Sequence, residues 1–160
     1  MHEGHPARQR VAAATLTACG AILVGIGLYF ILWRPPLLPE DVRFMGASLP
    51  DVEHAVPGLA RWLQMVFWVL GGYVVTTGLF TVYLSATALR TGRIPVALLA
   101  IAGVTSIGWM ALVNFLLDSD SKWPLLVLAV LWASALALVS VAGNSPARRP
   151  RPQSPSVHVC

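Results

Sequence analysis

The chain has 160 residues, of which 56% are hydrophobic and only 11% are charged, and its formal net charge is +4. Ordinary soluble domains carry about a quarter charged residues, so this composition excludes that class and places the chain in a lipid bilayer. The net positive charge does not indicate a nucleic-acid partner, because the basic residues are sorted by loop and form no single patch.

Four stretches are long and apolar enough to cross a bilayer, since a transmembrane helix needs about 20 apolar residues. None contains Lys, Arg, Asp, Glu or His, and none alternates as a transmembrane strand would. The predicted spans are residues 11–33, 62–89, 94–117 and 123–143. The sequence therefore predicts an all-α polytopic membrane protein, whose single domain (1–143) forms an up-down-up-down bundle of four transmembrane helices. Residues 144–160, rich in Pro, Ser and Arg, are predicted to be a disordered cytoplasmic tail.

The distribution of charge predicts the orientation. Seven of the eleven basic residues lie before the first span, between the second and third, or after the fourth, and these segments share one side. The loops on the other side, 34–61 and 118–122, hold six of the seven acids. By the positive-inside rule both termini are cytoplasmic in a multi-pass protein of the cell inner (plasma) membrane, and Trp33, Trp62 and Trp123 mark the outer boundary.

The first span contains Leu-Thr-Ala-Cys at residues 16–19, which has the form of a lipoprotein processing site. The apolar stretch before it is short and the chain stays apolar up to Trp33, so we expect an uncleaved span. Cys19 is then a small buried hydrophobic residue, and Cys160 lies in the tail, so no structural disulfide is expected.

Small residues four positions apart predict where helices approach each other in lipid. The sequence offers Ala13, Thr17, Ala21 and Gly25 on the first span, and Ala129, Ala133 and Ala137 on the fourth. Gly71, Gly72, Gly78, Gly103 and Gly108 either mark close helix crossings or reflect the general abundance of glycine in membrane helices.

The loop 34–61 is predicted to form a short helical cap on the outer face. Pro39 can begin a helix with two acids in its first turn, and Gly46 can end it. Ser48, with Asp51 three residues later, forms a capping box for a second short helix.

The segment LLPEDVRFMG, followed by LARWLQMVFWVLGGYVVTTGLF, resembles small, uncharacterised four-span bacterial inner-membrane proteins over roughly residues 33–85. The resemblance implies a bacterial inner membrane and four helices, and it provides no catalytic residues.

Several classes of membrane protein are disfavoured because the chain lacks the residues that their chemistry requires. No acid lies in the first span, as small multidrug exporters require, no cysteine pair suits a disulfide-generating enzyme, and no histidine within a span could bind haem. Asp51, Glu53 and His54 could supply metal ligands, but their spacing favours solvated loop charges. We therefore expect no enzyme activity, no catalytic residue, no cofactor and no metal site.

One candidate polar site remains, at the outer helix ends. Arg61 and Gln64 lie three residues apart at the outer end of the second span. Asn114 and Asp118 lie on one face at the outer end of the third. If these helices are neighbours, an Arg61–Asp118 ion pair could close a small polar site above Gln64 and Asn114. The alternative, which we favour, is an interfacial salt bridge with an interhelical hydrogen bond.

The leading functional hypothesis from sequence is a non-enzymatic accessory or assembly subunit that binds a membrane protein partner or forms a homo-oligomer within the lipid bilayer. The alternative is a small transporter, or a binder of a lipid or other apolar ligand, because such a function needs no charge at membrane depth.

Overall fold

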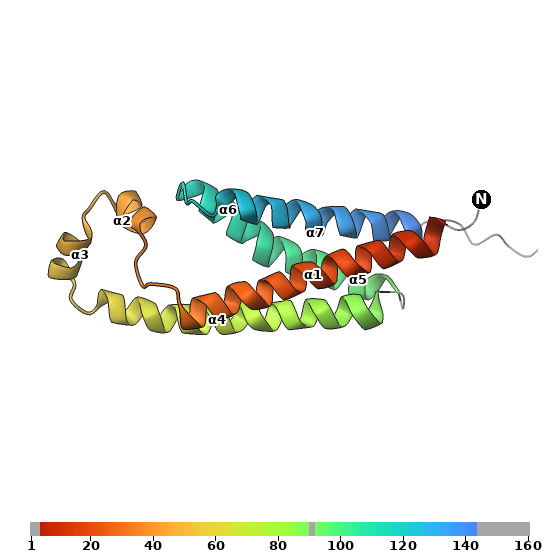
Figure 1. The fold of residues 1–160 in the computed structure, drawn as a ribbon, viewed down its shortest axis with the longest axis horizontal. Coiled ribbons are helices and arrows are strands. Elements are labelled where there is room, and N and C mark those ends of the chain that lie inside the picture. Colours follow the sequence, from red (N-terminus) through yellow and green to blue (C-terminus); the bar gives the residue numbers. More distant parts are fainter. Residues whose placement is uncertain (1–3, 90–91, 144–160) are drawn as a thin grey trace, which may run out of the picture.

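The structure is a computed structural model that describes residues 4–89 and 92–143, a part of the chain that contains helices and no strands (Figure 1). Helices α1 (Gly4–Leu32), α4 (Leu59–Tyr83) and α7 (Lys122–Gly143) are long, whereas α2 (Pro39–Met45) and α3 (Leu49–Ala55) are short. A π-helical turn, η1 (Leu84–Ala88), extends α4. The remaining long helix joins α5 (Arg93–Gly103), a second π-helical turn η2 (Val104–Gly108) and α6 (Trp109–Leu116).

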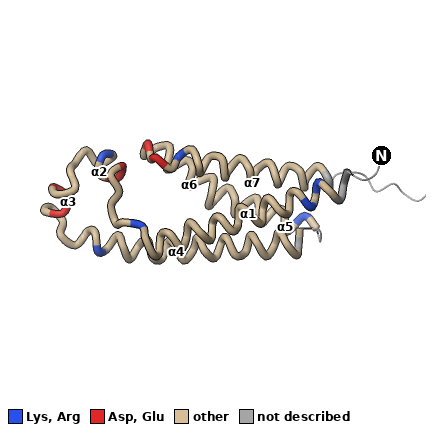
Figure 2. Tube along the Cα trace, in the orientation of Figure 1, with Lys and Arg blue, Asp and Glu red and all other residues tan. Residues whose placement is uncertain are grey.

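Four helical segments of the described chain are long and apolar enough to cross a membrane. They are Ala7–Leu32, Leu59–Thr87, Arg93–Leu116 and Lys122–Val141. Charged residues gather towards the two ends of the molecule and leave the middle uncharged (Figure 2). The described residues therefore confirm the predicted all-α class and the prediction of four helices long and apolar enough to span a membrane, whereas the predicted tail, 144–160, lies outside them.

Helix α1 lies between α4 and α7 and packs along both of them, and α7 in turn packs against α5, η2 and α6. The second and third spans meet where η1 approaches α5, and from there they diverge (Figure 1). The sequence prediction that these two spans are neighbours therefore holds near their connecting turn but fails towards the other end of the molecule.

Two glycine pairs bring α1 and α4 together. A Cβ atom at Gly78 would lie 2.6 Å from the carbonyl oxygen of Gly20, and one at Gly71 would lie 2.7 Å from the carbonyl oxygen of Gly27. Real Cβ atoms essentially never come so close to backbone, so only glycine permits this approach. The Thr17 hydroxyl adds a 2.9 Å hydrogen bond to the Ser85 hydroxyl at the same interface.

A different close contact joins α5 to α7. A Cβ atom at Gly103 would collide with the indole ring of Trp132, which is 3% exposed. The Trp132 Nε1–H donates a 3.1 Å hydrogen bond to the carbonyl oxygen of Leu99. Glycine 103 thus makes room for a buried tryptophan that links the third and fourth spans.

The predicted small-residue faces hold only in part: Ala13 and Ala129 pack against the core and Thr17 contacts Ser85, whereas the other members are not at contacts. Ala21 is exposed and Gly25 has open space around it, and on α7 Ala133 and Ala137 are also exposed. The buried face of α7 instead has the 3/4 spacing of a packed helix: Leu125, Leu128, Trp132, Ala135 and Val139. The physical reason is that one large ring fitted into a glycine notch buries more surface than a line of alanines.

The two short helices begin and end where the sequence predicts. Pro39 is the first residue of α2, and Gly46 ends it in the left-handed conformation, with φ of 68°. Ser48 caps α3, and its side chain accepts a hydrogen bond from the Asp51 backbone N–H. Both helices lie at the end of the molecule where α4 and α7 begin (Figure 1).

Candidate functional site

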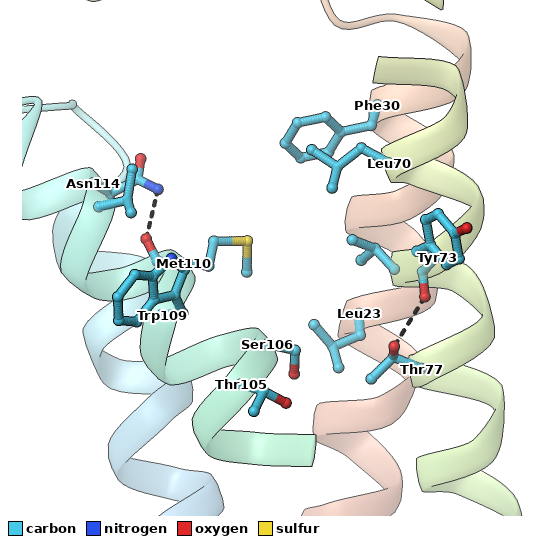
Figure 3. A pocket seen from close by; sticks show the side chains of 12 residues that line it. Leu23, Phe30, Leu70, Tyr73, Thr77, Thr105, Ser106, Trp109, Met110 and Asn114 are labelled. Atoms are coloured by element: carbon cyan, nitrogen blue, oxygen red, sulfur yellow. Dashed lines mark hydrogen bonds between the residues drawn. The ribbon is translucent and has the colours of Figure 1, made fainter. Parts of the chain in front are cut away.

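A cavity of about 470 Å³ lies between the α1–α4 pair and the η2–α6 part of the third span (Figure 3). One wall comes from α1 and α4 and contains Leu23, Phe30, Leu70, Tyr73, Val74 and Thr77. The facing wall comes from η2 and α6 and contains Thr105, Ser106, Trp109, Met110, Val113 and Asn114. The volume of the cavity is within the range of about 300–1,000 Å³ that is typical of small-molecule sites.

The π-helical turn η2 supplies two of the polar groups in the cavity wall. Such turns are rare within α-helices and occur frequently at functional sites. The Thr105 hydroxyl donates to the Ile101 carbonyl oxygen at 2.8 Å, and the Ser106 hydroxyl donates to the Ala102 carbonyl oxygen. These hydrogen bonds allow both hydroxyl groups to stay in an apolar surrounding.

Two further polar side chains in the wall also bond to their own helix. The Thr77 hydroxyl donates to the Tyr73 carbonyl oxygen at 2.9 Å, and the Asn114 amide donates to the Met110 carbonyl oxygen at 2.9 Å (Figure 3). None of the twelve described side chains that line the cavity is Asp, Glu, Lys, Arg or His. The cavity is therefore suited to an uncharged, mostly apolar molecule.

An arginine lies beside one end of this cavity, next to the Phe30 ring in its wall. The Arg34 guanidinium stacks 3.6 Å from the centre of the Phe67 ring and 5.3 Å from that of Phe30, and it pairs with Asp41 of α2 at 3.5 Å. Burial lowers the pKa of Arg34, and the Asp41 carboxylate opposes that shift. The arginine thus links α2 to the α1–α4 pair.

A second hollow of about 250 Å³ lies beneath α2. Its lining residues are Pro36, Leu37, Asp41, Phe44, Met45, Leu63, Phe67 and Leu117. The Phe67 ring, whose centre is 5.9 Å from that of Phe30, separates this hollow from the larger cavity.

Helix α2 is also attached to the turn between α6 and α7. Arg43 donates a 2.9 Å hydrogen bond to the Asp118 carbonyl oxygen, and the buried Ser119 hydroxyl donates to the carboxylate of Glu40, which is also buried. The Asp118 carboxylate pairs with Lys122 four residues later, which lowers the pKa of Asp118. Helix α2 therefore connects the two helix groups that border the cavity.

The structure separates the residues of the predicted polar site. Asn114 lines the cavity, and Gln64 is partly buried near the start of α4. Asp118 pairs with Lys122, and Arg61 is exposed and takes part in neither ion pair found among the described residues. The Arg61–Asp118 pair that we expected is not formed, because the second and third spans diverge at this end.

Asp51, Glu53 and His54 belong to α3. The Asp51 carboxylate accepts hydrogen bonds from the backbone N–H and the hydroxyl of Ser48, so it serves to cap the helix. Within the described part of the chain, no three His, Cys, Asp or Glu side chains are grouped closely enough to hold a metal ion.

Sequence reasoning missed Thr77, Thr105 and Ser106, which are hydroxyl residues in the interior of predicted spans. Their presence in apolar segments was a signal, but it did not show which face of each helix they occupy. Comparison of the chain with protein-family models, with curated proteins and with solved structures found no match. The proposed function therefore rests on the chemistry of the cavity.

Proposed function

We propose that this chain is a non-enzymatic, four-span protein of a bacterial inner membrane that binds an uncharged, lipid-like molecule in the cavity between α4 and α6. The observation that carries the proposal is a cavity of about 470 Å³ at the depth of the spans, walled by uncharged side chains. It favours the ligand-binding alternative over the accessory-subunit hypothesis.

The proposal includes an up-down-up-down topology with cytoplasmic termini and with α2 and α3 as an outer cap. The acidic residues of the described structure lie at one end, where basic residues also occur (Figure 2). The orientation is supported by the sequence, in which seven of the eleven basic residues lie before the first span, between the second and third, or after the fourth. In that orientation α2 covers the outer end of the cavity, and a ligand enters sideways from the bilayer between the diverging helices.

An accessory subunit would use the same opening differently, since a partner's transmembrane helix could lie between α4 and α6. Mass spectrometry of the intact protein, purified from its native membrane in mild detergent, distinguishes these functions. We expect a bound small molecule on the wild-type chain and less of it on Val113→Trp, in which an indole occupies part of the cavity.

The matched control is Leu112→Trp on the neighbouring residue, whose side chain is exposed and is not part of the cavity wall. This variant should keep the bound small molecule. A protein that copurifies in fixed ratio with the wild-type chain, without any bound small molecule, would overturn the ligand-binding proposal and support the accessory-subunit hypothesis.

A further inference from the structure

Three hydroxyl oxygens lie near the same end of the cavity, on opposite walls. Thr105 and Ser106 of η2 face the α1–α4 pair, with Leu23 and Thr77 across from them, whereas Asn114 lies towards the other end with Phe30 and Leu70 (Figure 3). Thr105 lies near the middle of the span Arg93–Leu116, so these hydroxyl groups are placed close to the centre of the bilayer.

The hydrogens of all three hydroxyl groups are already used. Each group donates to a carbonyl oxygen of its own helix, namely that of Tyr73, Ile101 or Ala102. A hydroxyl has one hydrogen to donate but two lone pairs, so what each oxygen offers the cavity is the ability to accept. These three hydroxyl groups therefore offer the cavity acceptors and no free hydrogen.

From this pattern we infer that the ligand carries a hydrogen-bond donor, such as an alcohol or phenol hydroxyl, that donates to the hydroxyl oxygen of Thr105 or Ser106 near the middle of the membrane. The inference rests on the proposed function and specifies its ligand class. An ether or ester oxygen at the same position would find no donor among these hydroxyl groups.

The same position disfavours an ordinary phospholipid. Its polar group lies at the membrane surface and only methylene groups reach the centre of the bilayer, where they offer no hydrogen-bond donor to the lone pairs of the three oxygens. A long-chain or polycyclic alcohol that lies deep in the bilayer could donate its single hydroxyl hydrogen to one of them.

The test compares two probes with the same dodecyl chain, 1-dodecanol and dodecyl methyl ether, in which a methyl group replaces the hydroxyl hydrogen of the alcohol. Binding to the full chain in mild detergent is measured from the rise of the unfolding midpoint with probe concentration. Each hydrogen bond between groups in a membrane protein is worth about 0.6 kcal/mol on average and about 1.7 at most, so we expect the alcohol to bind roughly 3- to 20-fold more tightly.

Two double variants remove the effect of unequal probe partition into detergent. Thr105→Val/Ser106→Ala should abolish the preference for the alcohol. Thr76→Val/Ser134→Ala removes two exposed hydroxyl groups that make the same type of bond to their own helices, outside the cavity, and should retain the preference.

The outcomes separate the inference from the proposed function. Equal binding of both probes to the wild-type chain, or an alcohol preference that survives Thr105→Val/Ser106→Ala, would overturn the inference while leaving an apolar ligand site in place. Failure of both probes to bind, or binding that Val113→Trp does not weaken, would overturn the proposed function and the inference together.

Discussion

Adjacent glycines on α4 should respond in opposite ways to the same substitution. A Cβ atom at Gly71 would lie 2.7 Å from the carbonyl oxygen of Gly27, whereas one at Gly72 would meet nothing within 4 Å. Replacing glycine by alanine within a helix gains about 1 kcal/mol from backbone propensity at either position. Overpacking costs about 1–3 kcal/mol, and only Gly71→Ala incurs it. The two variants should therefore differ in stability by about 1–3 kcal/mol, with Gly72→Ala the more stable.

The comparison can be made by unfolding each variant in mixed micelles of increasing SDS fraction and following far-UV circular dichroism. Because both substitutions add one methyl group to the same helix, their shared propensity term cancels from the difference. A partner substitution, Gly27→Ala, should be destabilising for the same reason as Gly71→Ala, since its Cβ atom would lie 2.7 Å from the Gly71 carbonyl oxygen. Equal stability of Gly71→Ala and Gly72→Ala would refute the close α1–α4 approach.

Two further substitutions test the other contacts that position the cavity. Trp132→Phe removes the indole hydrogen bond to Leu99 and should lower the free energy of unfolding by about 0.6 kcal/mol, and by about 1.7 at most. The control Trp68→Phe, at an exposed ring, should not lower it. Equal effects of the two substitutions in SDS titrations would contradict the assigned contact. Asp118→Asn retains a residue type that tolerates the left-handed backbone at this position, where φ is 52°, but loses the ion pair with Lys122. Since this pair lowers the folded-state pKa of Asp118, its stabilisation is present above the usual carboxyl pKa and disappears as pH falls through the lowered pKa. The stability difference between wild type and Asp118→Asn should follow that course in unfolding curves measured from pH 7 downward, and a difference independent of pH would count against the pair.

The sequence was sufficient for features that depend on local chemistry. The spans follow from apolar length, because a bilayer imposes its thickness on any helix that crosses it. The short helices follow from Pro39, Gly46 and the Ser48–Asp51 capping box, each of which acts within four residues of its own position. These predictions needed no knowledge of which helices are neighbours.

The pairing of helices could not be derived in the same way. Every span carries small residues on several faces, so Gly25 and Gly27 were equally plausible contact points until the partner helix was known. The contact between Trp132 and Gly103 joins residues 29 positions apart, and neither residue alone indicates the other. The candidate polar site failed for this reason, since Arg61 and Asp118 required a pair of neighbouring helices that the glycine contacts do not produce.

The cavity forms because the glycine contacts draw the second and third spans towards other helices and not towards each other. Gly71 and Gly78 face α1 and Gly103 faces α7, so the close approaches available to the second and third spans are directed away from each other. The surfaces that these spans turn towards each other carry bulky side chains such as Leu70 and Met110 instead, which keep the helices apart. Val113 lies on this separating surface and outside both glycine contacts, so an indole at that position occupies part of the cavity without disturbing the helix pairs that form it. Loss of ligand from Val113→Trp would accordingly report on binding rather than on folding.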